Sequence, residues 1–198
     1  MTRTPGRKRT AFLAAALLAL SGCGTPAPGP SSPPPVSVPS IPAPLDGAGF
    51  LADPCTAITV EQVESMGFTD GRRGNGRAGE CLLGFGPTVE VTVSWLTPLR
   101  ESIGSLYRDH ATGRDIGNRW EELAIQGYPA VVVRAEENIA RRQHEGPLAC
   151  KLALGVDDDT LVYVGANTRG RAEAGPWQYD SCGAAEKIAG FVIENLRS

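Results

Sequence analysis

The amino-acid sequence predicts an α+β domain in which an antiparallel sheet is flanked by helices and held by two disulfides. Several segments alternate apolar and polar residues, and the clearest of them runs from Val89 to Trp95. This is the pattern of a strand with one buried face. Two other segments repeat apolar residues at helical spacing. Helix, hairpin, helix, two strands, hairpin and helix follow one another along the chain, an order typical of α+β domains.

The first helix is predicted to follow Thr59 and to end near Gly67. Gln62 comes three residues after Thr59, so the two side chains can form a capping box at the start of this helix. The next segment, residues 72–79, is rich in glycine and arginine. We therefore expect it to be a loop without regular structure.

The remaining elements are predicted from the same two periodicities. A second helix is expected to start at Thr97 and Pro98, and its apolar stripe includes His110. A closing helix is expected after Ser181. From Cys150 to Val156, every second residue is expected to lie on a face turned away from the core. Strands are expected over residues 81–85, 89–95, 120–125, 128–134, 150–156 and 161–166.

Four cysteines lie after residue 47, and they are Cys55, Cys81, Cys150 and Cys182. Their spacings do not suit zinc, and an even number of cysteines in an exported chain is typical of disulfides. Three pairings are possible. We favour Cys55 with Cys81 and Cys150 with Cys182, because each bridge would then join a helix to the strand that should pack beside it.

The N-terminus has the pattern of a bacterial lipoprotein signal. Residues 1–22 carry four cations and no acidic residue, and they include an apolar stretch from Ala11 to Leu20. This stretch is too short to span a bilayer as a helix, which takes about 20 apolar residues. Leu20, Ser21 and Gly22 precede Cys23, whose thiolate is the nucleophile that a diacylglycerol would modify. We therefore expect Cys23 to be the acylated first residue of the mature chain.

Residues 23–47 are predicted to form a tether, and residues 48–198 a single domain. Prolines recur every two or three residues in most of the tether. Such segments favour extended polyproline II, which would let the domain stand up to roughly 70 Å from the membrane. Removing the signal leaves 15 Lys and Arg against 22 Asp and Glu, a net charge of −7. An acidic domain is a poor partner for nucleic acid, which binds clustered cations.

Few residues point to catalysis. The histidines are His110 and His144, and the chain has no Gly-x-Ser-x-Gly nucleophile elbow. A calcium loop places its ligands at alternate positions, whereas Asp157, Asp158 and Asp159 are consecutive. We expect a hairpin turn at these aspartates, and we expect neither a metal nor a cofactor.

Two aromatic residues lie outside the periodic segments, in the sequence Gly175-Pro176-Trp177-Gln178-Tyr179. Tryptophan and tyrosine combine a large apolar area with a polar edge, which suits them to ligand binding. Trp177 and Tyr179 are therefore the candidate binding residues.

The order of these features resembles a known family. A lipobox, a Pro/Ser tether, the sequence Asp53-Pro54-Cys55 before a capped helix and a second cysteine before the first strand are similar to a large actinobacterial family of secreted lipoproteins, domain of unknown function 3558. Basic residues that are nearly all arginine fit a GC-rich genome of that kind. The resemblance implies an extracytoplasmic location and disulfides, and it implies no catalytic residue.

The segment from Leu123 to Ala130 is also similar to a strand-turn-strand of PsbP-like and Mog1-like sandwiches, which implies a fold and no activity. From all of this we expect a lipoprotein on the outer face of the cell membrane, anchored through diacylglycerol on Cys23. It would be a non-catalytic binding or accessory module of the envelope, with a small apolar ligand, a glycan or an envelope protein as partner. The alternative is a weak hydrolase that uses His110 or His144.

Overall fold

The computed structural model describes residues 35–95, 101–114, 117–136 and 147–198. The chain divides into two compact units, Met1–Pro35 and Val36–Ser198, and the fold below is that of the second unit. The expected signal segment, Cys23 and the first part of the expected tether, up to residue 34, lie outside the described residues.

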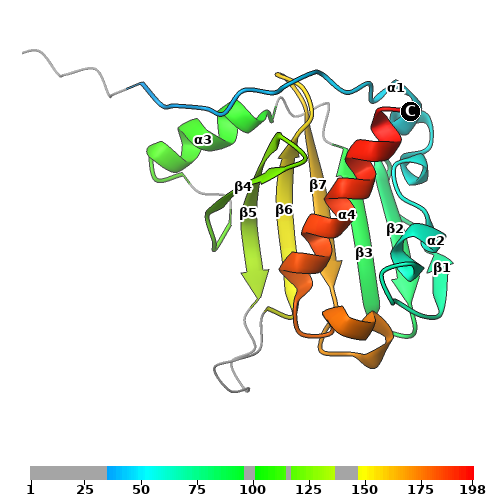
Figure 1. The fold of residues 1–198 in the computed structure, drawn as a ribbon. Helices are drawn as coiled ribbons and strands as arrows, with labels where there is room; N and C mark the ends of the chain where they lie inside the picture. Colours follow the sequence, from blue (N-terminus) through cyan, green and yellow to red (C-terminus); the bar gives the residue numbers. More distant parts are fainter. Residues whose placement is uncertain (1–34, 96–100, 115–116, 137–146) are drawn as a thin grey trace, which may run out of the picture. The chain divides into compact units, whose positions relative to one another are not determined.

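The second unit is built on one sheet of seven strands in the order β1-β2-β3-β7-β6-β5-β4 (Figure 1). Every neighbouring pair is antiparallel. This confirms the predicted α+β class. The strands are β1 (Gly71–Arg73), β2 (Glu80–Phe85), β3 (Val89–Trp95), β4 (Glu121–Ile125), β5 (Tyr128–Glu136), β6 (Ala149–Gly155) and β7 (Leu161–Asn167).

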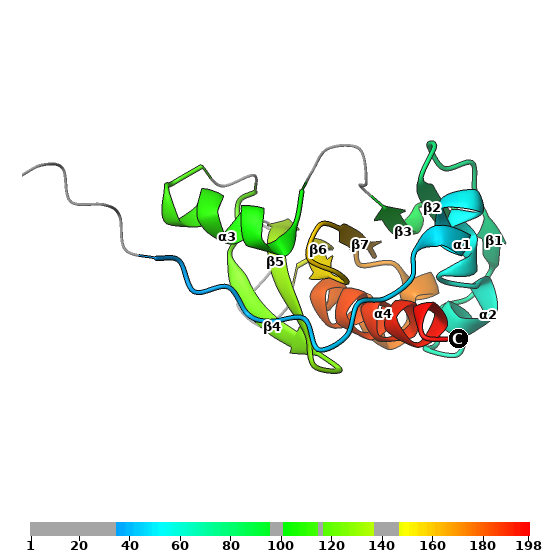
Figure 2. The same cartoon turned by 90° about the horizontal axis from the view of Figure 1, so that it is seen from above.

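Helices cover the two faces of the sheet unequally (Figure 2). One face packs against α4, and the short N-terminal helices lie beside β1, β2 and β3. On the other face, α3 lies near β5 and β6. The helical segments are α1 (Ala48–Ala52), η1 (Pro54–Thr56), α2 (Val60–Glu64), α3 (Ile103–Ala111), η2 (Ala172–Trp177) and α4 (Ser181–Leu196).

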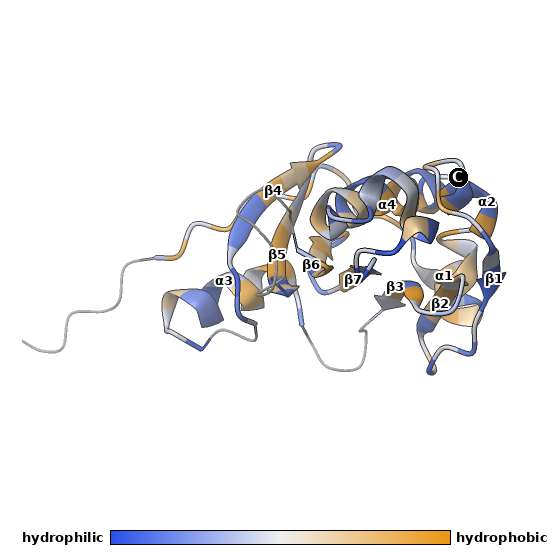
Figure 3. Cartoon of the chain, turned by 90° about the horizontal axis from the view of Figure 1, so that it is seen from below, coloured by the Kyte–Doolittle hydropathy of each residue, from blue (hydrophilic) through white to orange (hydrophobic). Residues whose placement is uncertain are grey.

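This arrangement gives two hydrophobic cores. The main core lies between the sheet and α4, and strands β5, β6 and β7 are largely hydrophobic while β1 is hydrophilic (Figure 3). The smaller core forms where Ile103 and Leu106 of α3 pack on Val131 and Ala153.

Ala153 and Gly155 were expected to face away from the core, but both are buried. The reason is α3, which covers this end of β6. A Cβ on Gly155 would lie 3.0 Å from the Cβ of Ile103, so the missing side chain lets α3 approach the sheet closely.

Two predicted boundaries were wrong, and a third falls on residues outside the described ranges. Arg72 and Arg73 are not in a loop, since they belong to β1 and pair with β2. The expected start of the second helix, Thr97 and Pro98, lies outside the described residues. The described helix α3 starts after Ser102, whose side chain accepts from the backbone N–H of Ser105 in a capping box. The closing helix is capped by Asp180, and Ser181 is its first residue.

Other predictions were confirmed. Thr59 and Gln62 form the expected capping box, with hydrogen bonds of 3.2 and 3.1 Å between each side chain and the other residue's backbone N–H. The aspartates after β6 form a turn, in which Asp157 accepts a hydrogen bond from the backbone N–H of Asp159 at 2.7 Å. Both favoured disulfides are present, Cys55–Cys81 and Cys150–Cys182.

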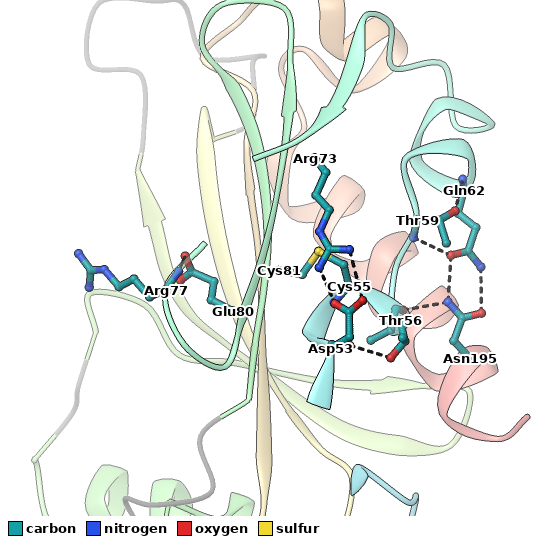
Figure 4. The surroundings of a disulfide bond; sticks show 11 residues. Asp53, Cys55, Thr56, Thr59, Gln62, Arg73, Arg77, Glu80, Cys81 and Asn195 are labelled. Atoms are coloured by element: carbon teal, nitrogen blue, oxygen red, sulfur yellow. Dashed lines mark hydrogen bonds and ion pairs between the residues drawn. A yellow bond between two sulfur atoms is a disulfide. The ribbon is translucent and has the colours of Figure 1, made fainter. Parts of the chain in front are cut away.

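Each disulfide joins a strand to a helical segment. Cys150 of β6 is bonded to Cys182 of α4, and Cys81 of β2 is bonded to Cys55 of η1. Beside the Cys55–Cys81 bridge, Asp53 and Arg73 form an ion pair (Figure 4). The hydrogen bond from Arg73 holds the pKa of Asp53 below its ordinary value, and one from the backbone N–H of Cys55 adds to this effect.

Residues 36–47, which the sequence analysis assigned to the tether, lie along the folded unit; we call this segment the strap (Figure 1). The backbone N–H of Leu45 donates to the carbonyl of Val156 at 3.0 Å, and the side chain of Leu45 is buried. The hydroxyl of Tyr128 donates to the carbonyl of Ala43 at 2.8 Å. Ile41 packs against both cores, so the strap connects them.

Candidate functional site on the open sheet face

The face of the sheet that carries α3 is only partly covered. Beyond α3, in the part of the chain that the structure describes, no helix packs on this face over β3 and β7. We call this uncovered area the open face. The pairing register places four residues of this face in a row across four strands. They are Thr92 of β3, Gly165 of β7, Lys151 of β6 and Arg134 of β5.

The open face is hollowed around Gly165. The hollow has a volume of about 180 Å³. A Cβ on Gly165 would lie 2.5 Å from the hydroxyl oxygen of Thr92, so glycine keeps the floor free of side chains. The polar residues around it are Glu90, Thr92 and Asn167 on one side and Lys151 and Arg134 on the other.

A β-bulge brings Arg134 to the open face. Strict alternation along β5 would place Arg134 on the same side as Val132, which lies in the main core. The register shifts by one residue between Val132 and Arg134, and Arg134 therefore pairs with Lys151. Bulges re-aim side chains in this way, and they are frequent next to functional sites.

Lys151 has unusual surroundings for an exposed lysine. Its Nζ lies 4.2 Å from the centre of the Tyr163 ring. Partial burial lowers the pKa of Lys151, and the positive charge of Arg134 lowers it further. The carboxylates of Glu101 and Glu80 act in the opposite direction. The ammonium is thus placed between one cation and two anions.

Tyr163 holds one of those anions in position. Its hydroxyl donates a hydrogen bond to Glu101, just before α3, at 3.0 Å. Burial raises the pKa of Tyr163, and the negative charge of Glu101 adds to this effect, so the tyrosine stays a neutral donor. Glu80 accepts a hydrogen bond of 3.3 Å from the hydroxyl of Ser94. The two carboxylates nearest to Lys151 are therefore held by hydrogen bonds before any ligand arrives.

A second hollow, of about 330 Å³, lies between α1 and the end of α4. It is larger, but the fold already uses its polar side chains. Asn195 donates to the carbonyl of Ala57 at 2.9 Å and forms two hydrogen bonds with Gln62 (Figure 4). By contrast, neither Arg134 nor Lys151 forms an ion pair or a side-chain hydrogen bond within the described residues. The hollow at Gly165 is therefore the better candidate site.

Of the candidate catalytic and ligand-binding residues that the sequence singled out, those that the structure describes do not line the hollow at Gly165. The ring of His110 stacks on Trp120 with their centres 3.9 Å apart. His144 lies outside the described residues. Trp177 donates its indole N–H to the carbonyl of Met66 at 3.0 Å and packs against the main core. Tyr179 lies close to Gly170, and a ligand contact by Trp177 or Tyr179 stays a prediction.

Sequence reasoning missed the residues of the hollow. Lys151 and Arg134 occupy outward positions of strands, where a charged side chain is unremarkable. Two signals were present. Gly165 lies in the interior of an apolar strand, which often marks the close approach of a ligand or another backbone. Lys151 is also one of only two lysines after the signal segment, the other being Lys187.

Comparison with known proteins gives a family. Residues 18–195 match a family model described as "Protein of unknown function (DUF3558)". The chain belongs to this family. The match covers both the end of the predicted signal and nearly all of the folded unit. No curated protein matches the DUF3558 chain. No solved structure matches it either, so the expected likeness to PsbP-like and Mog1-like sandwiches stays a prediction.

Two further findings concern the described residues of the DUF3558 chain. They contain no helix that is long and apolar enough to cross a membrane. In the same residues, no group of three or more His, Cys, Asp or Glu side chains is placed to hold a metal ion.

Proposed function

We propose that this DUF3558 chain is an extracytoplasmic lipoprotein, anchored through diacylglycerol on Cys23, that acts as a non-catalytic binding module of the cell envelope. The N-terminal pattern before Cys23 supports the anchor. The two disulfides support an oxidising compartment outside the cytoplasm. The ligand would bind in the hollow at Gly165.

One observation carries the binding proposal. The hollow is lined by charged and polar side chains, and two of them, Lys151 and Arg134, form no side-chain hydrogen bond or ion pair within the described residues. A bulge that interrupts β5 is what brings Arg134 there. Sites that bind small molecules are concave and carry a few polar groups that fix the orientation of the ligand. The open face has both properties.

Native mass spectrometry tests the binding proposal. The chain from residue 23 onward, with Cys23→Ser to prevent acylation, is purified from the envelope of its host and its native mass is compared with its denatured mass. We expect a discrete mass excess in the wild type. Ala149→Tyr should abolish it, because Ala149 lines the hollow and lies half-buried on β6. Tyrosine suits a strand, so the variant should fold.

Ala124→Tyr is the matched control, since Ala124 is an exposed residue of β4 away from the hollow. This variant should keep the mass excess. No excess in the wild type would contradict the binding proposal. An excess that survives in Ala149→Tyr would place the ligand outside the hollow.

The anchor is tested separately. In the host, wild-type protein should sediment with membranes and carry a lipid-modified N-terminal peptide that begins at Cys23. Cys23→Ser should be released from the membrane fraction. Recovery of the Cys23→Ser protein in the membrane fraction at the wild-type level would contradict lipid anchoring.

A further inference from the structure

We infer that the hollow at Gly165 binds a small, hydroxyl-bearing molecule through one anionic oxygen group, a carboxylate or a phosphate, placed between Arg134 and Lys151. The chemistry is that of an acidic sugar or a sugar phosphate. This inference rests on the proposed binding function and adds the class of ligand.

The first argument is the pair of cations. Arg134 and Lys151 lie directly opposite each other on neighbouring strands. Like charges in this relation destabilise a sheet. The repulsion is not required by the strand itself, because without the bulge regular alternation along β5 would turn residue 134 away from Lys151. An anion between the two side chains would replace their repulsion with two attractive contacts.

The second argument is the chemistry of the two cations. A guanidinium is planar and binds a carboxylate or phosphate through two parallel hydrogen bonds, while an ammonium acts as a compact point charge. The Lys151 ammonium also lies over the Tyr163 ring and is partly buried. Charge–charge contacts gain strength where water is partly excluded. The pair is thus suited to an oxyanion, and less so to a neutral group.

The third argument is the opposite side of the hollow. Glu90 and Asn167 pair across β3 and β7, and Thr92 lies beside them on the same face. A carboxylate accepts hydrogen bonds, whereas an amide and a hydroxyl group both accept and donate them, and the hydroxyl groups of a ligand match such a set. Glu90 would repel a second anionic group at this end. The ligand therefore carries its negative charge at one end and hydroxyl groups at the other.

The size of the hollow limits the ligand. Pockets for drug-sized molecules have volumes of about 300–1,000 Å³. The hollow at Gly165 has about 180 Å³, so it takes one small unit, and any longer molecule would extend beyond it. A fatty acyl chain does not fit this description, because the polar side chains around Gly165 would lose their hydration without gaining partners.

The two lysines of the mature chain allow a direct test. The chain from residue 23 onward, with Cys23→Ser, is labelled with ¹³C-lysine, so that its NMR spectrum contains the ε-methylene signals of Lys151 and Lys187 only. Lys187 is an internal control, because its Nζ also lies near an aromatic ring, at 5.3 Å from the centre of Phe191, but on α4. The probes are glucuronate, glucose 6-phosphate and uncharged glucose, each at the same ionic strength.

We expect a saturable shift of the Lys151 signal with glucuronate, with glucose 6-phosphate or with both, and none with glucose. Whichever anion binds more tightly identifies the carboxylate or the phosphate as the group. Arg134→Met should weaken this binding by roughly tenfold, because it removes charged hydrogen bonds to the anion. Arg134 is exposed, so the variant should fold as the wild type does.

Three results would overturn the inference: no saturable shift of Lys151 with either anion, equal shifts of Lys151 and Lys187, or an equal response to glucose. These outcomes differ from a failure of the binding proposal itself. If native mass spectrometry shows a bound molecule that Ala149→Tyr removes while Lys151 does not respond to the anions, the module binds a ligand in the hollow and only its class was wrong.

Discussion

The ammonium of Lys151 lies over the ring of Tyr163, with Nζ 4.2 Å from the ring centre. Such a contact attracts the cation to the negative face of the ring. The same tyrosine donates its hydroxyl hydrogen to Glu101 at 3.0 Å. Tyr163 therefore fixes both a cation and a carboxylate at the edge of the hollow, and the pKa of Lys151 reports on all the charges around it.

The pKa of Lys151 should respond in opposite directions to two substitutions. In the wild type it lies below the ordinary value of 10.5. Arg134→Met should raise it, because a neighbouring positive charge is removed. Glu101→Gln should lower it, because an attractive negative charge is lost while an acceptor for Tyr163 is kept. A pH titration of the ¹³C ε-methylene signal measures each value. Shifts of the same sign in both variants would contradict the geometry.

Lys151 should also affect stability at high pH. Its pKa is lower in the folded chain than in the unfolded chain, so between those two values the unfolded chain binds more protons. The contribution of Lys151 to the free energy of unfolding therefore rises with pH across that window, up to about 10.5. Lys151→Met lacks this contribution. We expect the stability difference, wild type minus Lys151→Met, to increase as pH rises toward 10.5.

Urea unfolding at a series of pH values measures this difference. Comparison with the variant is needed because the pKa of Tyr163 and Tyr107 is raised by burial, and such groups lower stability above pH 10 in both proteins. A difference that decreases with pH would have the wrong sign for a lowered lysine pKa.

Removal of either disulfide should destabilise the fold by about 3.5 kcal/mol on the chain-entropy account. The bridged cysteines are separated by 26 residues in Cys55–Cys81 and by 32 in Cys150–Cys182. Loops of such similar length differ by only about 0.2 kcal/mol in closure entropy. The variants Cys55→Ala/Cys81→Ala and Cys150→Ala/Cys182→Ala should therefore unfold at similar urea concentrations. A difference well above 1 kcal/mol would show that native packing around one bridge dominates.

Trp177→Phe should lower the free energy of unfolding by about 1–2 kcal/mol, because the carbonyl of the buried Met66 loses its indole donor. Trp120→Phe is the matched control. Its indole N–H donates to Glu122, which is exposed and can bind water instead, so we expect a smaller effect. Thermal unfolding measures both. If Trp177→Phe leaves stability unchanged but removes the native ligand, Trp177 belongs to a binding site, as the sequence first indicated.

Leu45→Ala should destabilise the fold by about 2–5 kcal/mol, the range for truncating a buried leucine. Val36→Ala at the start of the strap should have little effect, because Val36 is exposed.

A chain that begins at Val36 should likewise be as stable as the full mature chain, whereas one that begins at Ala48 should be markedly less stable. Equal stability of the two truncated chains would show that the strap contributes nothing to the fold.

The sequence predicted those parts of the fold that depend on local patterns. The strand from Val89 to Trp95 alternates cleanly because only one of its faces is covered, and the capping box at Thr59 depends on residues three positions apart. The disulfide pairing followed from the order of the elements. The short strand β1 was missed because Arg72 and Arg73 show no strand pattern of their own. They are in a strand only because they pair with β2.

The candidate site was not predictable in the same way. Its polar residues come from β3, β5, β6 and β7, and β3 is far from the other three in the sequence and meets β7 only through the strand order. The bulge that turns Arg134 toward Lys151 changes which face a side chain occupies, and alternation alone predicts the opposite face. Trp177 was chosen because its segment has no periodicity, yet a non-periodic segment can still pack against the core.

The strap shortens the spacer between the folded unit and the proposed lipid anchor, because residues 36–47 belong to the folded unit. Because the folded unit begins at Val36, the spacer after an acylated Cys23 is 13 residues long, from Cys23 to Pro35. As extended polyproline II, a spacer of this length would measure about 40 Å, instead of the roughly 70 Å expected when the tether was taken to continue to residue 47. If Cys23 is acylated as proposed, the module would therefore be held about 30 Å closer to the lipid headgroups than a tether reaching residue 47 would allow.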